Sequence, residues 1–272
     1  MKASLEMEVN REYWEGAATI ASNLSDLMLT LGEVNEAVMY GGWSVTHADR
    51  TDDWQVKMMF RTTHADALHQ SGRLEEAEVL FREAEAMQRE RQPEYSFLYS
   101  LLGYRFCDLL LGRAAYQEVM ERVEKTIEWA KQYFGLLDVA LDNLTHGRAW
   151  MMQAEKEGTG DFSRAFDYLD RAVEGLRESG DQDMLALALI KRAACSRLQS
   201  LFPRAWEDIN EAKEIAELGD MKLHLVDYHL EAGRVCSAEN KSDEANEHFK
   251  TAKKMIEETG YHRRDSEIMN YE

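Results

Sequence analysis

The residues whose spacing comes closest to a metal site are His224, Asp227 and His229. On a helix, residues 224 and 227 share a face but 229 points away from it, so a bound metal would need unusual geometry. We therefore interpret these histidines as solvated or interface residues. The sequence contains no GxxxxGK[ST], HExxH, CxxC or GxSxG motif. These observations predict a protein that is not an enzyme and needs no metal or other cofactor.

The cysteines and tryptophans are also interpreted as packing residues. Cys107, Cys195 and Cys236 are odd in number, widely spaced and inside predicted helices, which favours small buried side chains in a reducing cytoplasm over reactive thiols or disulfides. The six tryptophans are expected in the core and between repeats rather than in a ligand cage. They are Trp14, Trp43, Trp54, Trp129, Trp150 and Trp206.

Composition narrows the possible partners. The chain has 272 residues, only 2 prolines and a formal net charge of −19, which argues against nucleic acid or an anionic membrane as the main partner. No run of 18 apolar residues occurs, and the first residues lack the apolar segment of a signal peptide. We therefore expect a cytoplasmic, mainly helical protein that neither spans nor binds a membrane.

An internal repeat organises the chain. The stretch from Ser71 to Ala77 reads as a helix-turn-helix joint, in which Gly72 ends one helix and Leu74 opens the next. The position of Ala77 recurs at spacings of 40, 42, 46, 40 and 40 residues along the sequence. Its occupants are Ala37, Ala77, Val119, Ala165, Ala205 and Ala245. This register predicts an array of six helix pairs with a period of about 40 residues.

The helix pairs are expected to cover nearly the whole chain. The first helix of the first pair runs through Trp14, and the second, third, fifth and sixth pairs are expected to begin near Trp54, Tyr95, Asp183 and Lys222. The fourth pair carries Leu141, Leu144, Gly147 and Trp150. The prediction is one domain over residues 1–272, with repeats at about 12–258 and a polar cap at 259–272. In a repeat array such a cap covers the apolar face of the last repeat.

A small residue at the tight packing point of each first helix supports a specific resemblance. These residues are Ser25, Ala65, Gly103, Gly147, Ala193 and Gly233. Together with the recurring alanine, they resemble the tetratricopeptide (TPR) repeat in a longer-period variant. Ala21 and Arg61 depart from the large residue usual four places earlier, and the terminal proline is absent. The resemblance implies an all-α, right-handed α-solenoid of about six TPR-like hairpins.

A narrower resemblance rests on three segments. Residues 92–95 read QPEY, residues 99–111 read YSLLGYRFCDLLL, and residues 259–265 read TGYHRRD. They resemble the C-terminal TPR region of bacterial signalling NTPases of the STAND class, often with a NACHT module. In that class the repeats sense a partner and restrain or release the NTPase. The resemblance implies a sensor or regulatory module that is part of, or related to, such a protein.

A candidate ligand groove follows from the TPR resemblance. In TPR arrays the first helices line the concave face, and the residue after the small position points into it. This rule, extended by one turn and by the flanking position, predicts a groove that is acidic over the first three repeats and basic over the next three. Its residues are Asp26, Asp66, His69, Tyr104, Asp108, Arg148, Met152, Arg197 and Arg234. A random distribution of polar residues is the alternative explanation, and the lysine-and-asparagine carboxylate clamp of chaperone-binding TPRs is not recognisable.

Two functions remain open at this point. The first is a non-catalytic module that binds a protein or peptide in its groove. The second is a structural scaffold that packs on a neighbouring domain, such as an NTPase domain of the same parent protein, or mediates self-association. Six stacked helix pairs favour the first, because a preformed surface loses little conformational entropy on binding.

Overall fold

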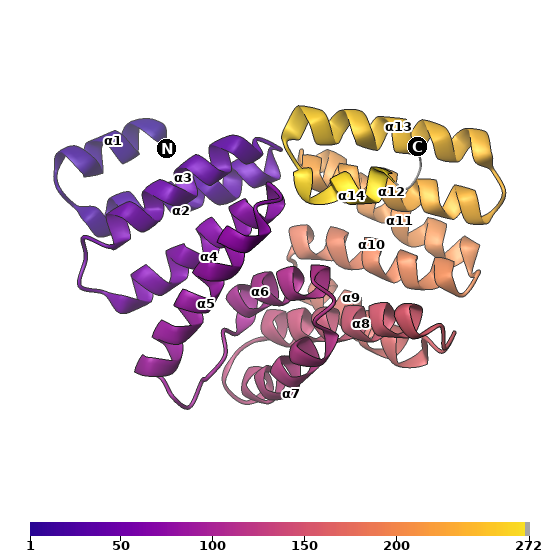
Figure 1. The fold of residues 1–272 in the computed structure, drawn as a ribbon, viewed down its shortest axis with the longest axis horizontal. Helices are drawn as coiled ribbons and strands as arrows, with labels where there is room; N and C mark the ends of the chain where they lie inside the picture. Colours follow the sequence, from indigo (N-terminus) through magenta and orange to yellow (C-terminus); the bar gives the residue numbers. More distant parts are fainter. Residues whose placement is uncertain (270–272) are drawn as a thin grey trace. The chain divides into compact units, whose positions relative to one another are not determined.

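The computed structural model describes residues 1–269, and within them it contains fourteen α-helices, one 3-10 helix and no strand. The helices are α1 (Lys2–Asn10), α2 (Trp14–Thr30), α3 (Val34–Ala48), α4 (Trp54–Gln70), α5 (Leu74–Arg91), α6 (Ser100–Gly112), α7 (Tyr116–Tyr133), α8 (Leu136–Glu157), α9 (Ser163–Ser179), α10 (Gln182–Leu198), α11 (Phe202–Leu218), α12 (Lys222–Ala238), α13 (Ser242–Thr259), η1 (His262–Arg264) and α14 (Asp265–Ile268). Helices α2 to α13 follow one another as six pairs (Figure 1). The prediction of an all-α array of paired helices is confirmed.

The joints inside the helix pairs share one backbone conformation. Five of the six described joints are three residues long, and the middle residue has a positive φ between 56° and 82°. These middle residues are Gly32, Gly72, Ala114, Ser200 and Asn240. The next residue donates its N–H to a carbonyl five positions earlier, as in Arg73 to Leu68 at 2.9 Å. This is the Schellman arrangement, which satisfies the last carbonyls of the first helix.

The structure forms two compact units. The first comprises Met1–Leu109 and Ile256–Ser266, and the second comprises Leu110–Met255 with residues 267–269 of the described chain. In the first unit α2 packs on α3 and α4, and α4 also packs on α5. Phe81 of α5 stacks on Phe106 of α6 with ring centroids 5.0 Å apart. The expectation of a single domain over residues 1–272 stays a prediction.

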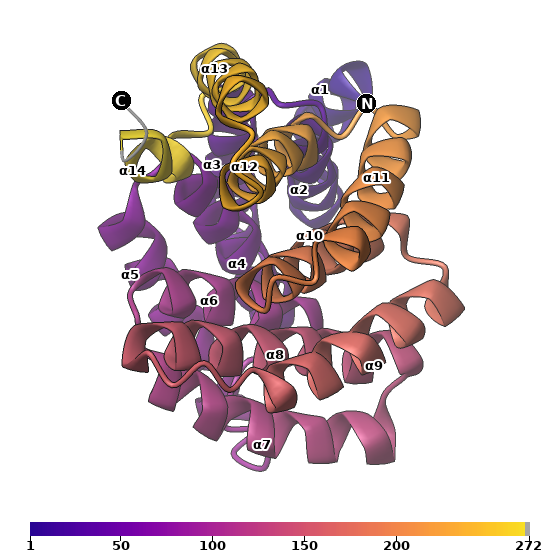
Figure 2. The same ribbon diagram turned by 90° about the vertical axis from the view of Figure 1, so that its right-hand side faces the viewer.

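In the second unit each helix from α7 to α12 packs on the next one along the chain (Figure 2). The first helices α8, α10 and α12 also contact one another in succession. They therefore form a continuous layer, and α9 and α11 each pack on two of its helices. α12 and α13 meet where Gly233 faces the ring of Phe249.

The predicted small-residue register is confirmed. The recurring position is buried throughout, and Ala77, Ala165, Ala205 and Ala245 are each at most 2% exposed. The first-helix position is equally tight in α8, where a Cβ on Gly147 would lie 2.7 Å from Leu169. Because side-chain atoms cannot approach so closely, these positions fix how near the paired helices come.

The cysteines match their prediction, and Trp206 of α11 packs between repeats as expected, against a buried cluster of α12 and α13. All three cysteines are buried and unbridged, and burial raises the pKa of Cys195 to about 12, so this thiol stays protonated and unreactive. None of the six tryptophans is fully buried, and Trp43 is 45% exposed. They lie at the edge of the core, where the indole N–H can reach a polar partner, as Trp206 does by donating to Glu239 at 2.8 Å.

The C-terminal segment makes contacts beyond the last repeat, which the prediction of a cap did not include. Residues 256–266 belong to the first unit, and η1 packs on α4. Gly260 has a φ of +75°, which turns the chain there, and it faces Asn35 of α3. Glu267, in the second unit, accepts a hydrogen bond from Arg234 of α12 at 2.5 Å. Residues 270–272 of the predicted cap lie outside the described residues, and its capping role stays a prediction.

Candidate functional site

The three aspartates predicted for the acidic part of the groove come from successive first helices of the first unit. Asp26 lies on α2, Asp66 on α4 and Asp108 on α6. Arg105 joins the first two, since its Nη2 donates to Asp26 at 2.8 Å and its Nε lies 3.1 Å from Asp66. We call Asp26, Asp66 and Asp108 the acidic stripe. It is a contiguous feature of one unit, with one arginine already bound to it.

A second arginine reaches the stripe from the C-terminal segment. Arg263 of η1 makes a bidentate contact with Asp108, in which its Nη2 donates to Oδ1 at 2.8 Å. Its Nη1 also donates to the Gln70 side-chain oxygen at 3.1 Å, and the Gln70 amide donates to Asp66 at 2.6 Å. His69 Nδ1 lies 3.8 Å from Asp108. The site therefore holds a guanidinium with a paired carboxylate and a polar neighbour, the planar geometry that arginine favours.

Burial makes these contacts energetically important. Asp66 and Asp108 are each 7% exposed, and His69 and Tyr104 are buried beside them. Burial raises the pKa of the Asp66 carboxyl, because desolvation outweighs the opposing effects of Arg105 and Gln70. A buried carboxylate without its partner would cost several kcal/mol, on the order of 3–5. The stripe thus depends on cationic partners.

The basic part of the predicted groove lies in the second unit and is paired differently. Arg197 of α10 donates to Glu231 of α12 at 2.6 Å, and Arg234 donates to the other oxygen of Glu231 at 3.3 Å. Arg148 of α8 is buried, whereas Met152 is half-buried. Arg197 and Arg234 therefore share one carboxylate.

Sequence reasoning missed the partners of the predicted site residues. Arg105, Arg263 and Glu231 did not figure in the predicted groove. Arg263 is separated from Asp108 by 155 residues, and no local spacing indicates such a pair. The assignment of all nine groove residues to a ligand-binding face stays a prediction.

The histidines singled out from the sequence do not meet. His224 is paired with Asp183 of α10 at 2.9 Å, and His229 Nδ1 lies 2.9 Å from Nδ1 of His248. Asp227 lies 3.9 Å from Lys191. Within residues 1–269 no group of three or more histidine, cysteine, aspartate or glutamate side chains is placed to hold a metal ion. Among the helices of residues 1–269, none combines the length and the apolar composition that a membrane-spanning segment needs.

Comparison with known proteins supports the fold. No protein-family model matches the chain, and no curated protein matches it by sequence. Among solved structures, it is similar to a single-substitution variant of a putative kinesin light chain from Podosopora anserina with nearly identical TPR-like repeats. That match has a TM-score of 0.50 and 15% identity, and it covers 72% of this chain and 93% of the other. A second structure of these kinesin light chain repeats matches with a TM-score of 0.49, 14% identity and the same coverage.

The structural similarity shows a TPR-like helical repeat fold. Identity at this level indicates architecture alone, so the partner and the site must be argued from the chain's own residues.

Proposed function

We propose that this chain is a non-catalytic protein-interaction module whose acidic stripe binds an arginine-bearing segment of a protein or peptide. The TPR-like fold supports an interaction role. The specific site rests on one observation, the bidentate contact of Arg263 with Asp108 beside Gln70. In this proposal Arg263 acts as an intramolecular occupant, which a basic segment of a partner replaces.

The proposal is physically reasonable because the stripe is already ordered. Arg105 fixes two of its aspartates across α2, α4 and α6, so a ligand would not have to assemble them. Binding then loses little conformational entropy on the receptor side. The exchange replaces one guanidinium by another, so the buried carboxylate of Asp108 is never left unpaired.

The biological context of the proposal comes from the sequence resemblance to STAND sensors. We place the module in a bacterial, cytoplasmic signalling protein whose ligand, or whose own NTPase domain, supplies the basic segment. The net charge of −19 favours such a basic protein partner over nucleic acid. A scaffold without a ligand of its own is the alternative, in which the Arg263 contact is permanent and only holds the first unit together.

Binding of an added peptide at the position of Arg263 distinguishes the ligand-binding function from the scaffold alternative. The probe is a labelled synthetic peptide with the sequence of residues 259–266, and its binding to the full chain is followed by fluorescence anisotropy. The Arg263→Gln variant, whose own arginine no longer occupies the stripe, is expected to bind the peptide at least about tenfold more tightly than the unsubstituted protein, which corresponds to about 1.4 kcal/mol.

Two controls assign the binding to the stripe. The same peptide with glutamine at the position of Arg263 should lose its affinity for the variant. Adding Asp108→Asn to Arg263→Gln should also abolish binding. If Arg263→Gln folds normally and does not bind the peptide, the contact is structural and the scaffold alternative holds.

A further inference from the structure

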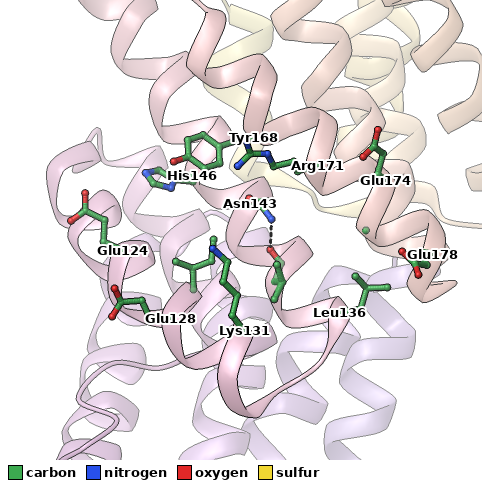
Figure 3. A pocket seen from close by; sticks show the side chains of 13 residues that line it. Glu124, Glu128, Lys131, Leu136, Asn143, His146, Tyr168, Arg171, Glu174 and Glu178 are labelled. Carbon is green, nitrogen blue, oxygen red and sulfur yellow. Dashed lines mark hydrogen bonds between the residues drawn. The ribbon is translucent and has the colours of Figure 1, made fainter.

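A separate candidate site lies within the second unit. It is a groove with a volume of about 710 Å³ lined by residues of α7, α8 and α9 (Figure 3). α8 packs on both α7 and α9, so it supplies the floor, and the flanking helices supply the walls. We call this cavity the α7–α9 groove.

The two walls carry matching pairs of glutamates. Glu124 and Glu128 lie one turn apart on α7, and Glu174 and Glu178 lie one turn apart on α9. Figure 3 shows the two pairs on opposite sides of the groove, and all four residues are exposed. Four carboxylates stand against two cations, Lys131 and Arg171, so the lining carries two more negative than positive charges.

Apolar side chains also line the groove, beside its polar residues. Ile127 and Val139 are half-buried in its lining, and Leu136 is 41% exposed at its edge. The turn that leads to Leu136 also exposes Tyr133 and Phe134. Exposed apolar side chains framed by charges mark a surface that another chain covers.

The lining of the groove includes a buried polar group that has no partner among the described residues. His146 of α8 lines the groove and is only 6% exposed, and its Nδ1 has no hydrogen-bond partner among the described residues. Its ring stacks on Tyr168 of α9 with centroids 4.2 Å apart. A buried polar atom without a hydrogen bond is unfavourable, and a ligand group that reaches it would remove that cost. This observation points to a ligand independently of the glutamates.

We propose that the α7–α9 groove is a docking site for a basic amphipathic helix of a partner protein. Apolar side chains of that helix would cover the floor, and its lysines or arginines would face the glutamates on both walls. A helix suits the site because it would lie between α7 and α9 and pack on α8, as helices do in groove recognition. The charge pairs would set the orientation and the association rate.

The site goes beyond the proposed function and is tested separately from it. The probe is a synthetic peptide of leucine and lysine at helical spacing, with a counterpart in which glutamate replaces lysine. Affinity is measured by fluorescence anisotropy on the full chain, and the imidazole signal of His146 is followed by NMR. We expect binding of the lysine peptide that shifts this signal, and weak or no binding of the glutamate peptide.

A matched pair of variants separates the effect of the groove glutamates on peptide binding from the effect of the protein's net charge. Replacing Glu124, Glu128, Glu174 and Glu178 by glutamine should weaken binding about tenfold or more. Replacing four exposed glutamates outside the groove by glutamine, Glu6, Glu15, Glu90 and Glu94, removes the same charge and should have little effect. Asp108→Asn, which alters the acidic stripe, should leave this affinity unchanged, so the two proposals can fail independently.

Several outcomes would overturn the groove proposal. Absence of binding by the unsubstituted protein is one. Equal weakening in the two fourfold variants would show that the peptide follows only net charge. An unshifted His146 signal at saturation would place the peptide elsewhere on the molecule.

Discussion

The surroundings of the Asp142 side chain on α8 disfavour its ionised form. Burial raises its pKa to about 7, and Asp138 adds repulsion, although Thr126 donates a hydrogen bond to Oδ1 at 2.9 Å. Because the folded-state pKa lies above the unfolded value near 4, the folded chain binds more protons between these pH values. Protonated Asp142 therefore contributes its full stabilisation to the fold below about pH 4. This contribution is lost as the pH rises to about 7.

The direction of this pH dependence can be tested with an isosteric variant. Asp142→Asn keeps the acceptor for Thr126 and removes the titration, so at pH 8 it should be more stable than the unsubstituted protein by roughly 2–4 kcal/mol. The difference should shrink steadily toward pH 4, as measured by urea unfolding across this range. Asp167→Asn, an exposed position on α9, serves as the control. A difference that does not change with pH would contradict the argument.

At the scale of the helices, the small residues of the repeat determine how closely the pairs pack. A Cβ on Gly147 would meet Leu169 at 2.7 Å and the Ala165 carbonyl oxygen at 3.1 Å. Gly147→Ala should therefore destabilise the chain by about 1–3 kcal/mol through overpacking, despite the better helix propensity of alanine. Gly112→Ala provides the matched control, because its Cβ would meet nothing within 4 Å.

Thermal and denaturant unfolding of the two glycine variants distinguish packing from propensity. Gly112→Ala is expected to be neutral or slightly stabilising. If Gly147→Ala is equally benign, α8 and α9 have room that the structure does not indicate.

The sequence predicted the pairing of these helices because the signals are local. Each pair repeats a small residue, a buried alanine or valine and a left-handed joint within about 40 residues, so the register could be recognised. Two joints carry glycine, but Ala114, Ser200 and Asn240 occupy the same conformation and give no glycine signal. The partners of the candidate site were not predictable in this way, since ion pairs such as Arg263 with Asp108 join distant segments.

At the scale of the whole chain, the C-terminal segment is what distinguishes the first unit from a simple stack of helix pairs. Tyr261 is 4% exposed, and it lies between Ile256, which is also buried, and Arg263, which pairs with Asp108. The segment therefore contributes both apolar burial and the cation that the acidic stripe requires. Its role as a cap and its role as an occupant of the stripe predict different results when it is removed or altered.

Deleting residues 261–272 tests both roles together. The deletion removes Tyr261 from the core and leaves Asp108 without the guanidinium of Arg263, so unfolding should become easier by about 3 kcal/mol or more. It should also expose apolar surface around Ile256 and promote self-association, which light scattering after size-exclusion chromatography would detect. Arg263→Gln, which keeps Tyr261 in place, should lose part of the stability without associating. A truncated chain that stays monomeric at high concentration and unfolds at the same denaturant concentration as the full chain would show that the segment neither caps the array nor supports the stripe.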